Sequence, residues 1–146
     1  MYTANHDASE VLDVITHGLS PGDGRCIDCA PSAFLPLYVE CLGDGLFTTA
    51  HYAQLQGDLE PDPDVEWWHA PRGTWVPLSI VQITGHQLVA VEIENGVPAR
   101  WNEAALRELV EFCNDWLGDN FVAQQGGLDA IRQAVQSVSQ HRPEEP

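Results

Sequence analysis

Residues 34–55, FLPLYVECLGDGLFTTAHYAQL, decide the fold of this 146-residue chain. Apolar side chains alternate with other side chains along residues 34–42 and again along residues 46–55, which is the period of a half-buried strand. The tripeptide Gly-Asp-Gly at positions 43–45 separates the two runs, and this composition is typical of a tight hairpin turn. The stretch therefore predicts an antiparallel hairpin.

More strands are expected after this hairpin. The candidates are residues 65–70, 74–83 and 87–94, and turn sequences rich in Gly, Pro and Asn separate them. The last run is the clearest, and three of its side chains are predicted to point inward: Val89, Val91 and Ile93.

Helical periodicity appears on both sides of the strands. Residues 7–19 carry apolar side chains at helical spacing, with Asp7 or Ser9 as the expected N-cap, and a loop is expected over residues 20–33. Asn102 is the expected N-cap of a second helix that ends at Gly118. Its apolar stripe comprises Leu106, Leu109, Val110, Cys113 and Leu117. Residues 119–140 form another helical stretch, which two glycines at 126–127 interrupt.

Strands clustered between helices predict an α+β fold. The expected architecture is an antiparallel β-meander of about four to six strands, with an N-terminal helix and two C-terminal helices packed on one face. One domain is expected over residues 1–140, followed by a polar C-terminal tail at 141–146.

The charge of the chain is strongly negative. It has 22 acidic residues, six arginines and no lysine, for a net charge of −16. The missing lysine excludes a P-loop and a Schiff-base enzyme, and the net charge disfavours direct binding to nucleic acid or to an anionic membrane. A basic protein surface is the expected partner.

The cellular location is predicted from the N-terminal residues, the length of the apolar runs and the cysteine content. Residues 1–7 resemble no secretory leader, and no apolar run is long enough to span a bilayer. Four cysteines in such a chain are expected to be reduced thiols, and the predicted location is the cytoplasm.

Five acids occupy alternate positions within nine residues. They are Asp58, Glu60, Asp62, Asp64 and Glu66. In an extended strand they would share one face with neighbours about 6.6 Å apart, although Pro61 and Pro63 favour a geometry that spreads them around the chain. A solvated acidic loop, a contact for a basic partner and a divalent cation site are the alternatives.

Two aromatic and two acidic residues extend the candidate partner-binding set. Trp67 and Trp68 are adjacent, so a strand would place them on opposite faces, and an exposed tryptophan beside acids is typical of an interface. The alternative is that both are covered. Glu92 and Glu94 are expected on the outward face of residues 87–94.

Metal-binding or catalytic chemistry is the competing hypothesis. Cys26 and Cys29 have the spacing of a zinc or redox pair but no second pair follows, so ordinary loop cysteines are the alternative. His51 with Asp58 and Asp62 could form a small hydrolytic or metal site, against a histidine that only bonds a neighbour. No nucleophile-elbow, zincin or dinucleotide motif occurs, so no catalytic residue is assigned and no cofactor is expected.

Residues 34–68 resemble a small domain family of plasmids, phages and integrative elements. The resemblance consists of an apolar strand, a hairpin, a strand that ends in His51-Tyr52, and the motifs Gly-Asp-Leu at 57–59 and Asp-Pro-Asp at 62–64. It carries over no catalytic residue. It implies a mobile genetic element, where small acidic proteins often inhibit CRISPR or restriction defences.

Three hypotheses follow from these features. The first is a non-enzymatic acidic protein that occupies the basic, nucleic-acid-binding surface of a host defence protein. The second is a small metal-binding or hydrolytic enzyme, and the third is a structural or regulatory homodimer through the tryptophan face. Uniformly spread charge would be about fourfold too dilute to imitate DNA. The first hypothesis therefore requires that folding gathers the acids onto one face.

Overall fold

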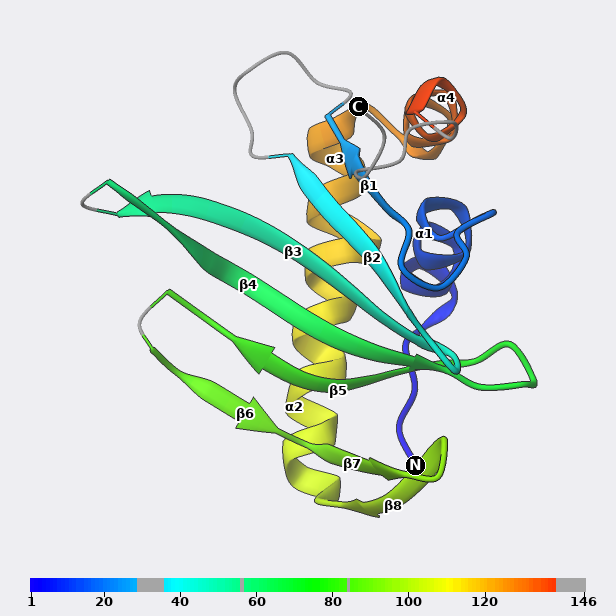
Figure 1. Cartoon of the computed structure of the whole chain (residues 1–146), viewed down its shortest axis with the longest axis vertical. Coiled ribbons are helices and arrows are strands. Elements are labelled where there is room, and N and C mark those ends of the chain that lie inside the picture. Colours follow the sequence, from blue (N-terminus) through cyan, green and yellow to red (C-terminus); the bar gives the residue numbers. More distant parts are fainter. Residues whose placement is uncertain (29–35, 56, 84, 139–146) are drawn as a thin grey trace.

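Six strands form one antiparallel sheet whose order follows the chain (Figure 1). The computed structural model describes residues 1–28, 36–55, 57–83 and 85–138. The strands of the sheet are β1 (Gly24–Ile27), β2 (Leu37–Gly43), β3 (Leu46–Leu55), β4 (Asp58–His69), β5 (Trp75–Val81) and β6 (Gln87–Val89). A second sheet pairs β7 (Val91–Glu94) with β8 (Val97–Trp101). The predicted antiparallel meander is confirmed.

The helices form a second layer behind this sheet. They are α1 (His6–Ile15), α2 (Glu103–Asp115), a π-helical turn η1 (Trp116–Phe121), α3 (Val122–Gln125) and α4 (Leu128–Val138). Figure 1 looks onto the opposite face of the sheet, with α2 running behind the strands. The predicted α+β class, with an N-terminal helix and C-terminal helices, is thus confirmed.

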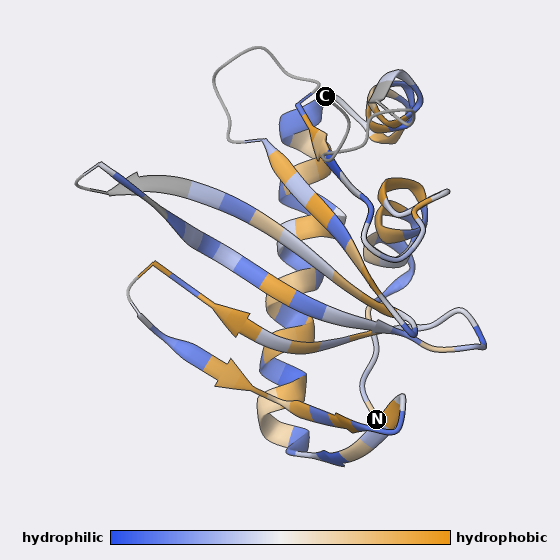
Figure 2. Cartoon of the chain, viewed as in Figure 1, coloured by the Kyte–Doolittle hydropathy of each residue, from blue (hydrophilic) through white to orange (hydrophobic). Residues whose placement is uncertain are grey.

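Strand register divides the sheet residues into inward and outward rows. One cross-strand row consists of Arg25, Val39, Thr49, Val65, Ile80 and Leu88. Its members from β1 to β5 are at most 5% exposed, so this row faces the helices. Because alternate residues of a strand point to opposite faces, the rows on either side of it face outward. The hydropathy colours of Figure 2 alternate along the strands accordingly.

The core lies between the inward rows and the apolar stripe of α2. All five predicted stripe residues are at most 6% exposed. Polar groups in this layer are paired: the Trp67 indole Nε1 donates to the hydroxyl of Thr49 at 2.9 Å, and both residues are fully buried. The amphipathic pattern was therefore sufficient to predict which face of α2 is buried.

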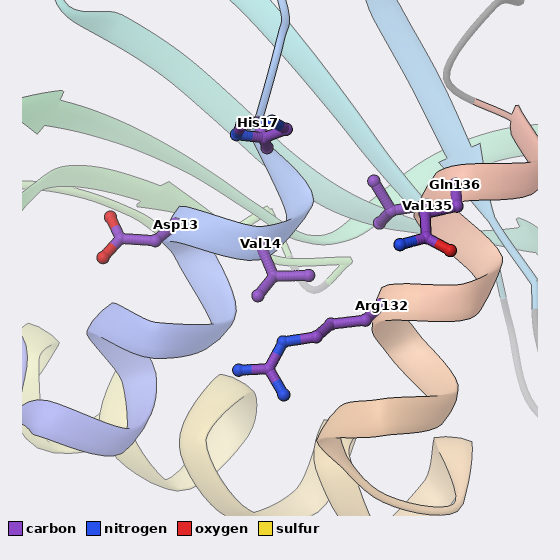
Figure 3. A pocket seen from close by; sticks show the side chains of 6 residues that line it. All are labelled: Asp13, Val14, His17, Arg132, Val135 and Gln136. Atoms are coloured by element: carbon purple, nitrogen blue, oxygen red, sulfur yellow. The ribbon is translucent and has the colours of Figure 1, made fainter.

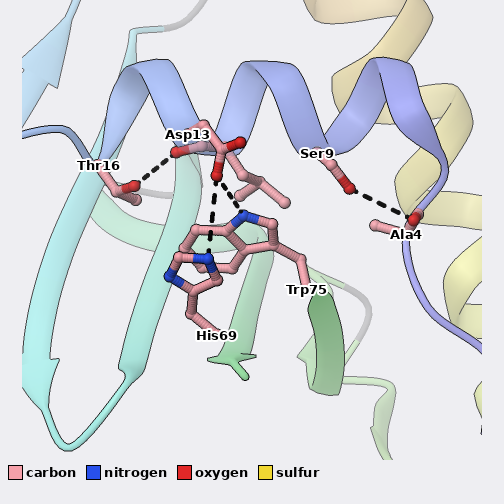
Figure 4. A network of polar contacts seen from close by, with 7 residues as sticks. Ala4, Ser9, Asp13, Thr16, His69 and Trp75 are labelled. Atoms are coloured by element: carbon pink, nitrogen blue, oxygen red, sulfur yellow. Dashed lines mark hydrogen bonds and ion pairs between the residues drawn. The ribbon is translucent and has the colours of Figure 1, made fainter. Parts of the chain in front are cut away.

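Helix α1 is attached to the sheet by a small polar network (Figure 4). The buried Trp75 indole Nε1 donates to Asp13 Oδ1 at 2.9 Å. The His69 ring stacks on Trp75 with a centroid distance of 3.9 Å, and its Nε2 lies 4.0 Å from the same Asp13 oxygen. One carboxylate of α1 thus contacts two strands.

Several predicted boundaries were wrong. Asn5, rather than Asp7 or Ser9, caps α1, since its side chain accepts from the Ala8 amide at 2.9 Å. Gly118 does not end the second helix, because the chain continues through the π-helical turn η1. A Cβ at Gly118 would lie 3.0 Å from the Ala8 amide nitrogen, so glycine is needed there for close approach to α1.

The loop expected over residues 20–33 contains strand β1, and the single strand expected over residues 87–94 is two strands. The Ala90 amide donates to Leu78 and its carbonyl accepts from Asn102, so the chain leaves β5 at this point and pairs with β8. This break reverses the exposure of the flanking side chains. Val89 is 54% exposed, whereas Val91 is 3% exposed, and the inward prediction was wrong for Val89.

Candidate functional site

The outward face of the sheet carries acidic and aromatic side chains in two adjacent rows. The first row runs Gly24, Glu40, Thr48, Glu66, Ser79 and Val89 across the six strands. The second runs Cys26, Tyr38, Ala50, Asp64, Val81 and Gln87. We call the five residues Tyr38, Glu40, Tyr52, Asp64 and Glu66 the outer patch.

The charge of the outer patch is not compensated. Strands β2 to β6 contain no arginine or lysine, and within the described ranges no ion pair involves its three carboxylates. Burial raises the pKa of the half-buried Asp64, and the nearby charges of Glu66 and Glu40 raise it further. A cation placed over this face would relieve that repulsion.

Aromatic rings stand directly beside these acids. Tyr38 is 44% exposed, and its ring contacts the ring of Tyr52 edge to face with a centroid distance of 5.4 Å. Burial raises the pKa of Tyr52, and the charges of Asp64 and Glu40 add to this shift. Trp68 lies two residues beyond Glu66 on the same face and is partly buried. Rings next to acids can bind a cation through their π faces.

The alternating acids do not form the single row that an unbroken strand would give. Pro61 pairs with Tyr52 and Asp64 pairs with Ala50, so β4 advances three residues where β3 advances two. This bulge reverses the alternation of β4. Asp64 and Glu66 consequently share the outer face. Glu60 and Asp58 come before the bulge, and their positions in the strand belong to the opposite face.

Asp62 lies within this bulge. Its Oδ1 accepts from the Ile83 amide at 3.4 Å, on the side of the neighbouring strand. The three acids Asp58, Glu60 and Asp62 are therefore separated from the outer patch. The sequence left open whether the five acids share one face or are spread around the chain, and the one extra residue in β4 divides them between the two faces.

Of the two adjacent tryptophans, only Trp68 is a candidate contact residue. They do point to opposite faces of β4, as expected. Trp67 is 0% exposed and packs against Trp75 in the core, so its assignment to a partner-binding surface was wrong. Because side chains alternate along a strand, Trp67 faces the helices and is fully buried, whereas Trp68 lies on the other face and is only partly buried.

Glu92 and Glu94 lie apart from the outer patch, on the two-stranded sheet. Arg100 of β8 donates to both carboxylates, from Nε to Glu92 at 2.9 Å and from Nη2 to Glu94 at 3.0 Å. Arg100 therefore neutralises part of the charge of Glu92 and Glu94. Because two acids share one arginine in solvent, the trio retains one net negative charge.

His51 is a buried structural residue in the described chain. It is 8% exposed, and its Nδ1 lies 3.0 Å from the Pro36 carbonyl, a geometry in which Nδ1 donates. Its ring contacts Trp116 at a centroid distance of 5.5 Å. Burial lowers the pKa of His51, whereas the Pro36 bond and the charge of Asp62 raise it. The arrangement suits a neutral imidazole, and the proposed partner Asp58 is exposed at the start of β4.

The structure describes one member of the predicted cysteine pair, Cys26. Cys29 lies outside the described residues, so the spacing of the two sulfurs is not described. Cys26 shares a row with Tyr38, and burial raises the pKa of its thiol. Among the described residues, the group with metal-binding spacing is His6, Asp7 and Glu10, which is exposed on α1 and was not predicted.

Two hollows are the most relevant to binding. One, of about 490 Å³, lies on the outer face over β1 and β2, and Gly24, Tyr38 and Glu40 line it. The other, of about 260 Å³, lies between α1 and α4 (Figure 3). There Arg132 reaches toward α1, but its guanidinium already donates to Asp129 at 2.9 Å. The first hollow adjoins the outer patch and the second does not.

No helix in the described part of the chain is long and apolar enough to span a bilayer. The sheet has one helical layer, and its outer face carries acidic and aromatic side chains, which defines a small α+β protein. The chain belongs to the family described as Domain of unknown function (DUF6908), whose model matches residues 14–127. No curated protein and no solved structure matches the chain.

Proposed function

We propose that this protein is a non-enzymatic binding protein that uses its outer patch to occupy a basic protein surface. The observation that carries the proposal is the row geometry, which places Glu40 and Glu66 in one row and Asp64 in the next, beside exposed tyrosine. Strands β2 to β6 supply no cation to neutralise them. Complementary charge chiefly sets association rate and specificity in such complexes.

The partner that best fits this chemistry is a protein that normally holds nucleic acid. The resemblance of residues 34–68 to a family of mobile elements favours a host defence protein, either a CRISPR effector or a restriction enzyme. The accessible surface is 8259 Å², so the net charge of −16 averages one charge per about 520 Å², against roughly one per 100 Å² on duplex DNA. Local acids and aromatic contacts, rather than overall imitation of DNA, are therefore proposed to supply the affinity.

A panel of purified CRISPR effectors and restriction enzymes tests this proposal. DNA cleavage by each is measured with and without the protein, at rising salt. The expected result is inhibition of at least one enzyme that weakens as salt rises. The inhibition should also be lost when Glu40→Gln, Asp64→Asn and Glu66→Gln are combined.

A matched control separates the outer patch from total charge. Glu108→Gln, Asp115→Asn and Asp119→Asn remove the same number of charges from exposed positions on α2 and η1. The control should inhibit like the wild type. Equal loss of inhibition in both triple variants, or inhibition that survives the outer-patch variant, would overturn the proposal.

A further inference from the structure

The hollow over β1 and β2 lies beside Glu40 on the outward face. Gly24 lies directly opposite Glu40 in the β1–β2 ladder and is buried, and Glu40 Cγ lies 3.4 Å from the position that a Cβ of Gly24 would take. Glu40 is exposed and lines the hollow, and the next outward pair, Cys26 and Tyr38, lines it on one side. A hollow of about 490 Å³ is ample for one long side chain.

The Tyr38 ring is held in a defined position beside this hollow. Cys26 is its partner across the β1–β2 ladder, and its ring meets the Tyr52 ring edge to face at a centroid distance of 5.4 Å. A ring fixed on two sides loses little entropy when a ligand stacks on it. The exposed part of the ring thus offers a ready π surface.

We infer that this hollow is a subsite for an arginine side chain of the partner. The inference rests on the proposed function and deepens it. The guanidinium stacks on Tyr38 and donates its fork of N–H groups to Glu40. A planar guanidinium can make both contacts at once, whereas a lysine ammonium is a compact, strongly hydrated point charge.

Charge complementarity selects this occupant over an apolar one. Glu40 has no cationic partner in the described part of the chain, and Asp64 and Glu66 extend the negative surface across β4. Arg25 also lines the hollow, but it is 5% exposed and its Nη1 donates to the Ile15 carbonyl on the helix side of the sheet. An apolar side chain would cover the Glu40 carboxylate without a compensating donor, at a cost in desolvation. An anionic side chain would be repelled.

Two peptides of equal charge provide the test. Nonapeptides of alternating glycine with arginine, or glycine with lysine, are titrated calorimetrically into the full chain at fixed salt. The arginine peptide is expected to bind about fivefold more tightly, which corresponds to one exposed cation–π contact. Gly24→Ala should reduce this preference to about one, since the new Cβ would already lie 3.1 Å from the Val39 carbonyl and 3.4 Å from Glu40 Cγ.

Tyr38→Leu performs the same test without touching the strand backbone and should also remove the preference. Tyr38→Phe keeps the ring and should retain it. The control Tyr2→Leu replaces a tyrosine that is 42% exposed elsewhere and should leave the preference unchanged.

The outcomes distinguish this inference from the proposed function. Equal affinity for both peptides in the wild type, with both weakened by the outer-patch triple variant, would overturn the arginine subsite and leave the binding surface standing. Affinity for both peptides that is insensitive to the triple variant would overturn the two together.

Discussion

Gly24 and Glu40 face each other across the β1–β2 ladder, and both line a hollow on the outer face of the sheet. The relationship depends on β1, a four-residue edge strand. The outward row continues from Glu40 through Thr48 to Glu66, so the hollow and the acids of β4 lie on one continuous row. The candidate surface is therefore a property of strand register rather than of any one loop.

The first prediction concerns the repulsion within the outer patch. Because burial and neighbouring acids raise the pKa of Asp64, its ionised form opposes folding. Asp64→Asn should stabilise the protein at pH 7 by roughly 0.2–1 kcal/mol, the size of one pairwise interaction between side chains on a sheet face. A raised carboxyl pKa contributes stability that is complete below the unfolded pKa and lost as pH rises through the folded pKa.

The advantage of Asp64→Asn should consequently vanish when denaturation is measured below about pH 3.8, the ordinary value for this group. Denaturant melts at several pH values check this. A variant that is less stable than the wild type at pH 7 would show that Asp64 is favourably paired, which contradicts the description of the patch.

The second prediction concerns acid sensitivity at His51. Burial is the largest cause of its shift and lowers its folded pKa below the ordinary 6.5, so its neutral form stabilises the fold above that value. Stability should then decrease as pH falls from about 6.5 toward the folded pKa. His51→Gln should flatten this part of the pH profile, and the exposed His86→Gln should not. An unchanged slope in His51→Gln would argue against a buried neutral imidazole.

The third prediction concerns the attachment of α1. The Trp75 indole N–H is buried, and Asp13 is its acceptor. Asp13→Ala leaves that donor unpaired and should lower the free energy of unfolding by about 1–3 kcal/mol. Asp13→Asn retains an acceptor oxygen and should cost clearly less in the same denaturant melts. Equal losses in the two variants would show that charge, rather than the hydrogen bond, accounts for the attachment.

The fourth prediction concerns Gly118 in the π-helical turn. A methyl group there would lie 3.0 Å from the Ala8 backbone nitrogen, so the backbone of α1 or η1 would have to move by a few tenths of an ångström. Gly118→Ala should destabilise the protein by about 1–3 kcal/mol, as overpacking does. Asn120→Ala, at an exposed position of the same turn, should remain within about 0.5 kcal/mol of the wild type. A stable Gly118→Ala variant would mean that α1 and η1 are further apart than described.

Most of the fold was predictable because its signals are local. Alternation identified β2 and β3, and helical spacing identified every buried residue of the α2 stripe. Strand β1 was missed because four residues are too few to show a period, and β8 because Pro98 and Arg100 interrupt its apolar character. The break at Ala90 depends on a change of pairing partner, which no local pattern encodes.

The candidate site was less predictable, for a topological reason. Sequence spacing suggested that the acids from Asp58 to Glu66 act together, but a single extra residue in β4 divides them. Glu40 and Tyr38 were not singled out, since they reach Asp64 only through two strand pairings. The uncompensated acid of β2, Glu40, could have been assigned to the outward face once the hairpin register was assumed.

The central claim is that a cationic partner binds the outer patch and not the acidic chain at large. The most direct measurement is a titration of isotope-labelled protein with the glycine–arginine nonapeptide, followed by backbone amide chemical shifts. The account predicts that the largest shift changes fall on outward positions of β1 to β4, around Gly24, Tyr38, Glu40 and Asp64. Changes spread evenly over all acidic segments, or centred on α2 and the β7–β8 sheet, would contradict it.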